Sequence, residues 1–296
     1  MATEEQLVKW TAPSSSTEQD KQVRTERMIR EAIRDHEGFD GYRSSFSIYA
    51  KGSYANNTNV RADSDVDIVV ECSDVIYWRN QDTANPGYKG GTPYSGIWTP
   101  EKLRSEVALA LQKKFPGSVS EGKTAFEIDA SSSRVHADVV PSFVFKLYYS
   151  DGSFAQGTKV FKRDGSSVEN YPKQQYEKGI AKNNRTDYRY KKAVRILKRL
   201  ENRLVEKGLC NAVPSFVLEC LIFNCPEEFL TRTTWRSVMR GCLARIYKHT
   251  LKAEASDDRW VETNGIKFLF HPNQKWTPQQ IHDFSLAAWN YMEFEE

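Results

Sequence analysis

The chain has 296 residues, of which 39% are hydrophobic and 12% aromatic, so it has enough apolar material for one large or two modest folded domains. No apolar run reaches the roughly 20 residues of a membrane-spanning helix, and the N-terminus lacks the apolar segment of a secretory signal. We therefore expect a cytoplasmic protein without a membrane partner. The formal net charge of +3, from 42 basic and 39 acidic residues, is too balanced to require a nucleic acid.

The first half of the chain is predicted to combine helices with a sheet. Residues 1–16 are polar and serine-rich, which favours an extended lead-in, and a helix is expected from Thr17, with Thr17 as its cap. Residues 79–100 hold four glycines and three prolines and are predicted to form a surface loop. The apolar spacing predicts a second helix over 100–115 and strands over 46–50, 66–72, 125–130, 135–140 and 143–149.

The second half is predicted to be mainly helical. Residues 150–187 are rich in Gly, Ser, Asn and Lys and are expected to form a long connection. From Tyr188 onward the apolar spacing predicts helices over 188–204, 213–223, 235–251 and from Pro278, with a short β-like stretch over 260–270. Five cysteines without a CxxC pair indicate neither a disulfide framework nor a zinc site, and Cys220 and Cys225 are expected to be buried thiols rather than metal ligands.

Two carboxylates stand at the start of a predicted strand. Asp65 and Asp67 are two residues apart, and since successive side chains alternate between the faces of a strand, both point the same way, about 7 Å apart. Two carboxylates side by side repel each other unless a cation lies between them. Magnesium, which prefers carboxylate and phosphate oxygens, is the natural occupant.

A glycine and a serine follow the preceding predicted strand. Gly52 allows backbone N–H groups to approach an anion closely, and the Ser53 hydroxyl adds a donor. A phosphate group is the obvious ligand for this turn.

Holding two metal ions requires a third carboxylate. Asp138 lies in the run 135–140, which is otherwise mostly apolar, and a charged residue in such a setting is rarely buried without a partner. Asp129, on the neighbouring predicted strand, is the alternative. Two nearby aspartates alone indicate little, because surface carboxylates often flank strands. The ordered set of strand, Gly-Ser, polar loop, paired aspartates and later acidic strand is more specific, and we favour Asp138.

The same segments carry a family resemblance. Residues 51–61 (KGSYANNTNVR) and 63–68 (DSDVDI) resemble the bacterial cGAS/DncV-like nucleotidyltransferases (CD-NTases) of the polymerase-β-like superfamily, and residues 26–29, 194–198 and 214–219 also fit. The resemblance covers most of the chain. It implies an α+β fold with a polymerase-β-like nucleotidyltransferase sheet core, a C-terminal helical domain and an active site in the cleft between them. The core with its N-terminal helix would span 1–165, and the nucleotide-clamping helical domain 166–296.

The resemblance implies roles at matching positions. Asp65, Asp67 and Asp138 would be catalytic and would hold two magnesium ions, for which manganese can substitute. The donor triphosphate would contact Gly52, Ser53, Lys198, Ser215 and Phe216, with Phe216 stacking on the base.

The residues themselves leave alternatives to three of these roles. Lys198 shares a helix face with Lys191 and Arg195, which could be an ordinary solvated basic face. Phe216 could be a core aromatic, and Ser215 could simply cap its helix.

The family makes cyclic di- or trinucleotide signals in anti-phage defence (CBASS), and this implies the partners of the chain. Its substrates would be ribonucleoside triphosphates, ATP together with UTP or GTP, joined by two-metal nucleotidyl transfer with release of pyrophosphate. A downstream effector would receive the product. The chain lacks the His/Cys zinc insertion of the animal cyclic GMP-AMP synthase, so we expect no zinc and no requirement for nucleic acid. We expect a monomer.

Two other readings stay open. A nucleotidyltransferase of the same fold could act on an RNA or protein acceptor, and a binding module could keep the fold without the chemistry. The sequence does not assign the bases, the linkage or the ring size. Asn183, Asn184 and the loop 79–100 are candidates for base choice.

Overall fold

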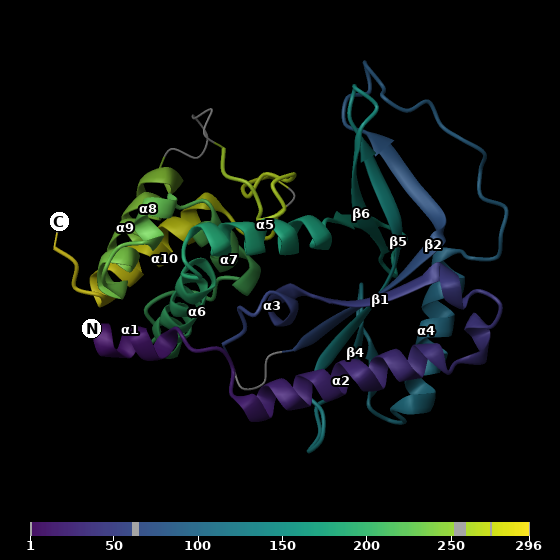
Figure 1. Cartoon of the computed structure of the whole chain (residues 1–296), viewed down its shortest axis with the longest axis horizontal. Coiled ribbons are helices and arrows are strands. Elements are labelled where there is room, and N and C mark those ends of the chain that lie inside the picture. Colours follow the sequence, from purple (N-terminus) through teal and green to yellow (C-terminus); the bar gives the residue numbers. More distant parts are fainter. Residues whose placement is uncertain (1, 61–64, 252–258, 273, 296) are drawn as a thin grey trace. The chain divides into compact units, whose positions relative to one another are not determined.

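The computed structural model describes residues 2–60, 65–251, 259–272 and 274–295, which divide into two compact units (Figure 1). The sheet unit comprises Ser15–Tyr54 and Ala62–Pro172, and the helical unit comprises Met1–Ser14, Ala55–Arg61 and Lys173–Glu296. This division differs from the expected ranges 1–165 and 166–296, because residues within 2–14 and 55–60 contact the C-terminal helices. The predicted α+β class with a C-terminal helical domain is confirmed.

The sheet unit is built on one seven-stranded mixed sheet. Its central pair, β2 and β5, is parallel, and its other neighbouring strands are antiparallel. The strand order is β1-β2-β5-β4-β3, with β6 pairing β5 and β7 pairing β6. The strands are β1 (Phe46–Lys51), β2 (Val66–Asn80), β3 (Val119–Glu121), β4 (Phe126–Ile128), β5 (Ala137–Tyr148), β6 (Phe154–Phe161) and β7 (Ser167–Asn170).

Helices α2 (Ser16–Arg34) and α4 (Pro100–Lys114) contribute to the same apolar core as one face of this sheet (Figure 1). Alternate residues of β2, among them Ile68 and Val70, are fully buried in that core. The cap of α2 is Ser15 and not the predicted Thr17, because the Ser15 hydroxyl and the Glu18 carboxylate form a capping box. Two short 3-10 turns, Glu37–Phe39 and Arg43–Ser45, lead from α2 into β1.

Two predictions about the strands are wrong. The runs 135–140 and 143–149 form one strand, β5, which continues through Pro141. Pro141 lies between the stretch of β5 that pairs with β4 and the stretch that pairs with β6. Its missing N–H therefore interrupts neither of these two ladders. Residues 150–187 are not a connection but contain β6, β7 and helix α5. The middle of β6, Gln156 to Lys159, contains no large apolar side chain, so its apolar content is too low to reveal a strand.

The helical unit is a bundle around a continuous apolar core. The core includes Leu197, Leu218, Leu243 and Phe284, all at most 1% exposed. The predicted start of the last helix at Thr277-Pro278 is confirmed, since the Thr277 hydroxyl accepts from Gln280 N. The helices are α1 (Glu4–Trp10), α5 (Pro172–Arg185), α6 (Tyr190–Glu206), α7 (Ser215–Phe223), α8 (Glu227–Leu230), α9 (Trp235–Thr250) and α10 (Pro278–Tyr291).

The N-terminal segment is helical where an extended lead-in was predicted. Thr3 caps α1, and Leu7 is fully buried in the core of the helical unit. The Glu4 carboxylate accepts hydrogen bonds at 2.7 Å from the backbone N–H groups of Trp235 and Arg236, at the start of α9. A seven-residue helix is marginal by itself, so these tertiary contacts decide its conformation.

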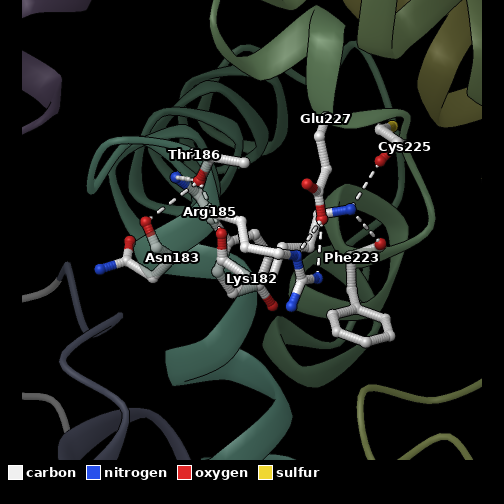
Figure 2. A network of polar contacts seen from close by, with 8 residues as sticks. Lys182, Asn183, Arg185, Thr186, Phe223, Cys225 and Glu227 are labelled. Carbon is white, nitrogen blue, oxygen red and sulfur yellow. Dashed lines mark hydrogen bonds and ion pairs between the residues drawn. The ribbon is translucent and has the colours of Figure 1, made fainter.

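A buried lysine ties α5 to the end of α7 (Figure 2). The Lys182 ammonium donates to the carbonyl oxygens of Phe223 and Cys225 at 2.7 Å each, which complements the negative end of a helix. Nearby, Arg185 pairs with Glu227 at 2.7 Å. The expected burial of the Cys220 and Cys225 thiols is confirmed. No helix within the described ranges is both long and apolar enough to cross a membrane.

Candidate active site

A row of charged side chains crosses the face of the sheet opposite to α2 and α4. The strand register places Lys51 of β1 beside Asp67 of β2, Asp67 beside Asp138 of β5, and Asp138 beside Glu127 of β4. Residues directly opposite each other on neighbouring strands project to the same face. Three carboxylates and one ammonium therefore line up across four adjacent strands.

Each of the two predicted aspartates at the start of β2 has a side-chain nitrogen close to one of its oxygens. The Lys51 Nζ atom lies 3.4 Å from Asp67 Oδ1. His136, which precedes β5, has its Nδ1 atom 3.3 Å from Asp65 Oδ1. The Lys51 ammonium offsets part of the repulsion among the carboxylates.

Asp138 is a partly buried carboxylate beside Asp67 on the neighbouring strand. Its Oδ1 atom is buried and has no hydrogen-bond partner within the part of the chain that the structure describes. Burial, and after it the negative charges of Asp67 and Asp65, raises the pKa of Asp138 to about 6. A buried carboxylate oxygen without a partner is costly. The site therefore favours a bound cation, and its all-oxygen donor set suits magnesium.

The structure nevertheless shows no preformed metal cage. In the ranges 2–60, 65–251, 259–272 and 274–295, no three His, Cys, Asp or Glu side chains are grouped so that they could hold an ion. Asp65 and Asp67 are engaged with His136 and Lys51 instead. If Asp65, Asp67 and Asp138 bind a metal ion, the contacts of Asp65 with His136 and of Asp67 with Lys51 would be replaced by contacts with the ion. Metal binding by these three residues stays a prediction.

Gly52 brings the backbone directly against the carboxylate row. Its φ of +68° lies in the left-handed region, and a Cβ atom there would stand 2.3 Å from Asp67 Oδ2. A glycine is therefore required at this turn on two grounds. Gly52 and Ser53 open a four-residue helix, α3 (Gly52–Ala55). Their contact with a phosphate stays a prediction.

Lys198 of α6 is buried within the helical unit and is not part of a solvated basic face. Lys198 is only 3% exposed, and its ammonium donates to Thr58 Oγ1 at 3.3 Å. Arg195, on the same helix, is also buried and donates to the backbone oxygens of Thr11 and Asn57. The alternative of an ordinary surface stripe is therefore wrong for these two residues, while the phosphate contact of Lys198 stays a prediction.

Ser215 and Phe216 begin α7. Pro214 is the residue at the cap position, and the Ser215 side chain is exposed, so Ser215 is not the helix cap. Phe216 is half-buried against the core of the helical unit, with its ring 6.1 Å from that of Trp276. The predicted contacts with a donor nucleotide are compatible with this partial exposure and stay predictions.

The candidates for base choice differ in exposure and in their hydrogen bonds. The Asn183 side-chain oxygen accepts from Lys191 N at 3.1 Å, so this amide already stabilises the start of α6. Figure 2 shows Asn183 also engaged through its backbone oxygen with Thr186. Asn184 is exposed. In the loop 79–100, the Tyr88 ring stacks on Tyr148 at 4.4 Å.

The motif residues Arg61, Asp63 and Ser64 lie outside the described residues.

Sequence reasoning missed three residues of the charged row and its surroundings: Lys51, Glu127 and His136. His136 and Asp138 are two residues apart, so a reading of strand alternation could have placed both on one face. Lys51 and Glu127 carry no comparable local signal, because only the register of neighbouring strands brings them next to the aspartates.

Glu71 gives the first testable prediction. It lies on the same face of β2 as Asp67, four residues further along, is 8% exposed and accepts from the Tyr49 hydroxyl at 3.1 Å. Burial raises the pKa of Glu71 from 4.5 to about 7. The folded state thus holds the proton more tightly than the unfolded chain, so the contribution of Glu71 to stability is favourable at low pH and is lost as the pH rises through about 7.

Replacing this carboxyl by an amide should therefore stabilise the protein at high pH. We expect Glu71→Gln to raise the free energy of unfolding by about 3 kcal/mol at pH 8 and by less than about 1 kcal/mol at pH 5. Urea denaturation at the two pH values measures this difference. Glu101→Gln, at an exposed position of α4, is the matched control and should show no such pH dependence. An equal effect of Glu71→Gln at both pH values would contradict the prediction.

Comparison with known proteins bears on the whole chain. Residues 177–293 match the family described as the cGAS/DncV-like nucleotidyltransferase C-terminal helical domain. The chain is 36% identical over 295 residues to a cyclic dipyrimidine nucleotide synthase CdnE from Legionella pneumophila, with 98% of each chain covered.

Two solved structures share the fold over nearly the full length. The Elizabethkingia meningoseptica CdnE cyclic dinucleotide synthase, solved with GTP and Apcpp, has a TM-score of 0.82 and 29% identity, with 99% of both chains covered. The Rhodothermus marinus CdnE c-UMP-AMP synthase, solved with Apcpp and Upnpp, has a TM-score of 0.82 and 25% identity, covering 100% of this chain and 99% of that chain.

Proposed function

The chain belongs to the cGAS/DncV-like nucleotidyltransferase family, and we propose that it joins ribonucleoside triphosphates into a cyclic dinucleotide with release of pyrophosphate. The observation that carries this proposal is the register pairing of Asp67 with Asp138, next to the backbone of Gly52. Full-length similarity to named cyclic dinucleotide synthases supports it.

The carboxylate row supplies the groups that such a reaction needs. Bound magnesium would lower the pKa of the attacking ribose hydroxyl and neutralise charge on the leaving pyrophosphate. Asp65, Asp67 and Asp138 would hold the ions. Asp138, with a pKa of about 6 in the free protein, is mainly ionised at neutral pH and could accept the proton of the hydroxyl.

The remaining predicted contacts would orient the donor triphosphate. Gly52 and Ser53 would bind its phosphates from the turn after β1, and Lys198 and Ser215 would bind them from the helical unit. Phe216 would stack on the donor base, which needs an aromatic ring that is only partly covered, as it is here.

The bases of the product are open to experiment. The relatives compared above are named for dipyrimidine and UMP-AMP products or were solved with GTP and an ATP analogue, so similarity does not select among them. We propose a cytoplasmic role in anti-phage defence, in which a separate effector binds the product. The family membership supports this role.

Mass spectrometry of the reaction products tests the proposal. The purified chain is incubated with all four ribonucleoside triphosphates and magnesium, without RNA or protein added, and we expect a cyclic dinucleotide together with pyrophosphate. Digestion with a nuclease specific for 3′–5′ bonds then identifies the linkage. The matched control is Asp67→Asn, which should give no product.

The two rival functions predict other outcomes of the same experiment. Transfer of labelled nucleotide only to an added RNA or protein would favour the acceptor-dependent nucleotidyltransferase. A chain that binds magnesium-ATP but forms no phosphodiester bond under any of these conditions would be the non-catalytic binding module. Either result would overturn the proposed synthase activity.

A further inference from the structure

A buried carboxylate on α7 collects three hydrogen bonds within the helical unit. Glu219 is 3% exposed. Its Oε1 atom accepts from Asn56 Nδ2 at 3.1 Å and from Gln175 Nε2 at 3.2 Å, and its Oε2 atom accepts from Thr58 Oγ1 at 3.0 Å. A buried anion is stable only when such donors surround it. Glu219 thus connects α5, α7 and the segment 55–60.

The Thr58 hydroxyl links Glu219 to Lys198. It donates its single proton to Glu219, and its oxygen accepts from Lys198 Nζ at 3.3 Å. A hydroxyl has one donor and two acceptor positions, so the bond to Glu219 leaves the oxygen lone pairs available for the ammonium. The carboxylate of Glu219 therefore sets the orientation of the Thr58 hydroxyl, and this orientation decides whether its oxygen can accept from Lys198.

The charges of Lys198 and Glu219 also depend on each other. Burial lowers the pKa of Lys198, and the negative charge of Glu219 acts in the opposite direction. In a poorly solvated interior, removing one partner leaves the other uncompensated. Glu219 therefore helps Lys198 to keep its positive charge in a position almost without access to solvent.

The segment that carries Thr58 is fixed at further points. The Arg195 guanidinium donates to the Asn57 carbonyl oxygen at 2.6 Å, and Asn59 Nδ2 donates to Ser14 Oγ at 3.1 Å. Asn56, Thr58 and Asn59 are all buried. This segment follows Gly52-Ser53 in the chain and precedes Asp65, so the polar loop of the sequence motif belongs structurally to the helical unit.

We propose that Glu219 is a positioning residue, which acts through the Thr58 hydroxyl to hold the Lys198 ammonium where it meets the donor triphosphate. The inference rests on the proposed function, in which Lys198 contacts the phosphates. Glu219 itself would touch neither substrate nor metal. Its effect on the reaction should therefore pass entirely through Lys198.

Glu219→Gln tests this role with little change of shape. The amide nitrogen would replace Oε2 and present a second donor to Thr58, and Lys198 would lose its counter-charge. For the pair of triphosphates that gives the most product, we expect KM to rise about tenfold and kcat to change by less than about threefold. In a Lys198→Met background, Glu219→Gln should cause no further rise in KM, because the group through which it acts is gone.

Glu201→Gln is the matched control for a purely structural role. Glu201 lies on α6, is 5% exposed, and accepts from the backbone N–H of Val213 at 2.9 Å. Both variants are expected to lower the melting temperature, but the control should leave KM unchanged. An unchanged KM in folded Glu219→Gln, or an effect that adds in full to that of Lys198→Met, would overturn the proposal.

A second measurement separates this inference from the proposed function. Amide hydrogen exchange of residues 56–59 in the nucleotide-free protein should accelerate in Glu219→Gln and not in Glu201→Gln. If the wild-type chain makes no cyclic product, the synthase activity fails, and the exchange data together with the affinity for magnesium-ATP still test whether Glu219 holds the loop and Lys198. Equal exchange in the two variants would remove the structural basis of the inference.

Discussion

Asp138→Asn is expected to reduce product formation at least about 1,000-fold and, at the same time, to stabilise the metal-free protein. The activity falls because the variant loses a proposed metal ligand and proton acceptor. The stability rises because the amide removes a charge that burial, Asp67 and Asp65 all disfavour, as the raised pKa of about 6 indicates. A loss of activity together with a gain in stability distinguishes a functional carboxylate from a structural one.

The stabilisation has a defined pH dependence. Because the folded pKa of Asp138 lies above its ordinary value of 3.8, ionisation costs stability as the pH rises through about 6. The gain in Asp138→Asn should therefore be small below pH 4 and reach roughly 1 to 3 kcal/mol above pH 7. Thermal unfolding in metal-free buffer at pH 4, 6 and 8 measures it.

The alternative carboxylate provides the control. Asp129 follows β4, is exposed, and has no place in the observed register beside Asp67. Asp129→Asn should keep both activity and stability within normal error. If Asp138→Asn retains turnover while Asp129→Asn loses it, the assignment of the third carboxylate is wrong. Asp67→Asn should match Asp138→Asn in activity but not in stability, because it also loses the contact with Lys51.

Gly52→Ala is expected to lower activity at least about 100-fold and to destabilise the fold by about 2 kcal/mol or more. Two effects add at this position. The φ of +68° disfavours any residue with a Cβ atom, and the added methyl would stand 2.3 Å from Asp67 Oδ2, which is inside van der Waals contact. The turn or the carboxylate must shift, and both belong to the proposed site.

Gly117→Ala isolates the first effect, the backbone strain, from the close contact with Asp67. Gly117 has a nearly identical φ of +71°, but no described atom lies within 4 Å of the position that its Cβ would take. We expect Gly117→Ala to cost about 1 kcal/mol from backbone strain alone and to keep full activity. Steady-state rates and urea denaturation of the two variants provide the comparison. Equal losses in both would show that the close approach of Gly52 to Asp67 has no role in the reaction.

The sequence contained strong local evidence for several elements and for the site carboxylates. The apolar run 66–72 predicted the beginning of β2, and the helix starts predicted at Pro100 and at Thr277-Pro278 are confirmed. Such signals are readable because capping and side-chain alternation act between residues only a few positions apart. The family, too, could be inferred from two short segments, because catalytic motifs are local in the chain.

The tertiary structure decided what depends on residues far apart in the sequence. The neighbours of Asp67, which are Lys51 and Asp138, are set by the pairing of β1, β2 and β5, and no local pattern specifies that register. Helix α1 forms because Glu4 meets the start of α9.

The same is true of the buried charges in the helical unit. Lys198 looks like a surface lysine in sequence, since its helix is rich in basic residues. Its burial follows from residues 55–60, which belong to the helical unit and meet Glu219 and Lys198 through Thr58. The sequence by itself determined which groups carry the chemistry, because residue type and local spacing encode them. Only the tertiary structure decided which charges face each other, because burial and long-range pairing set the electrostatic partners of each group.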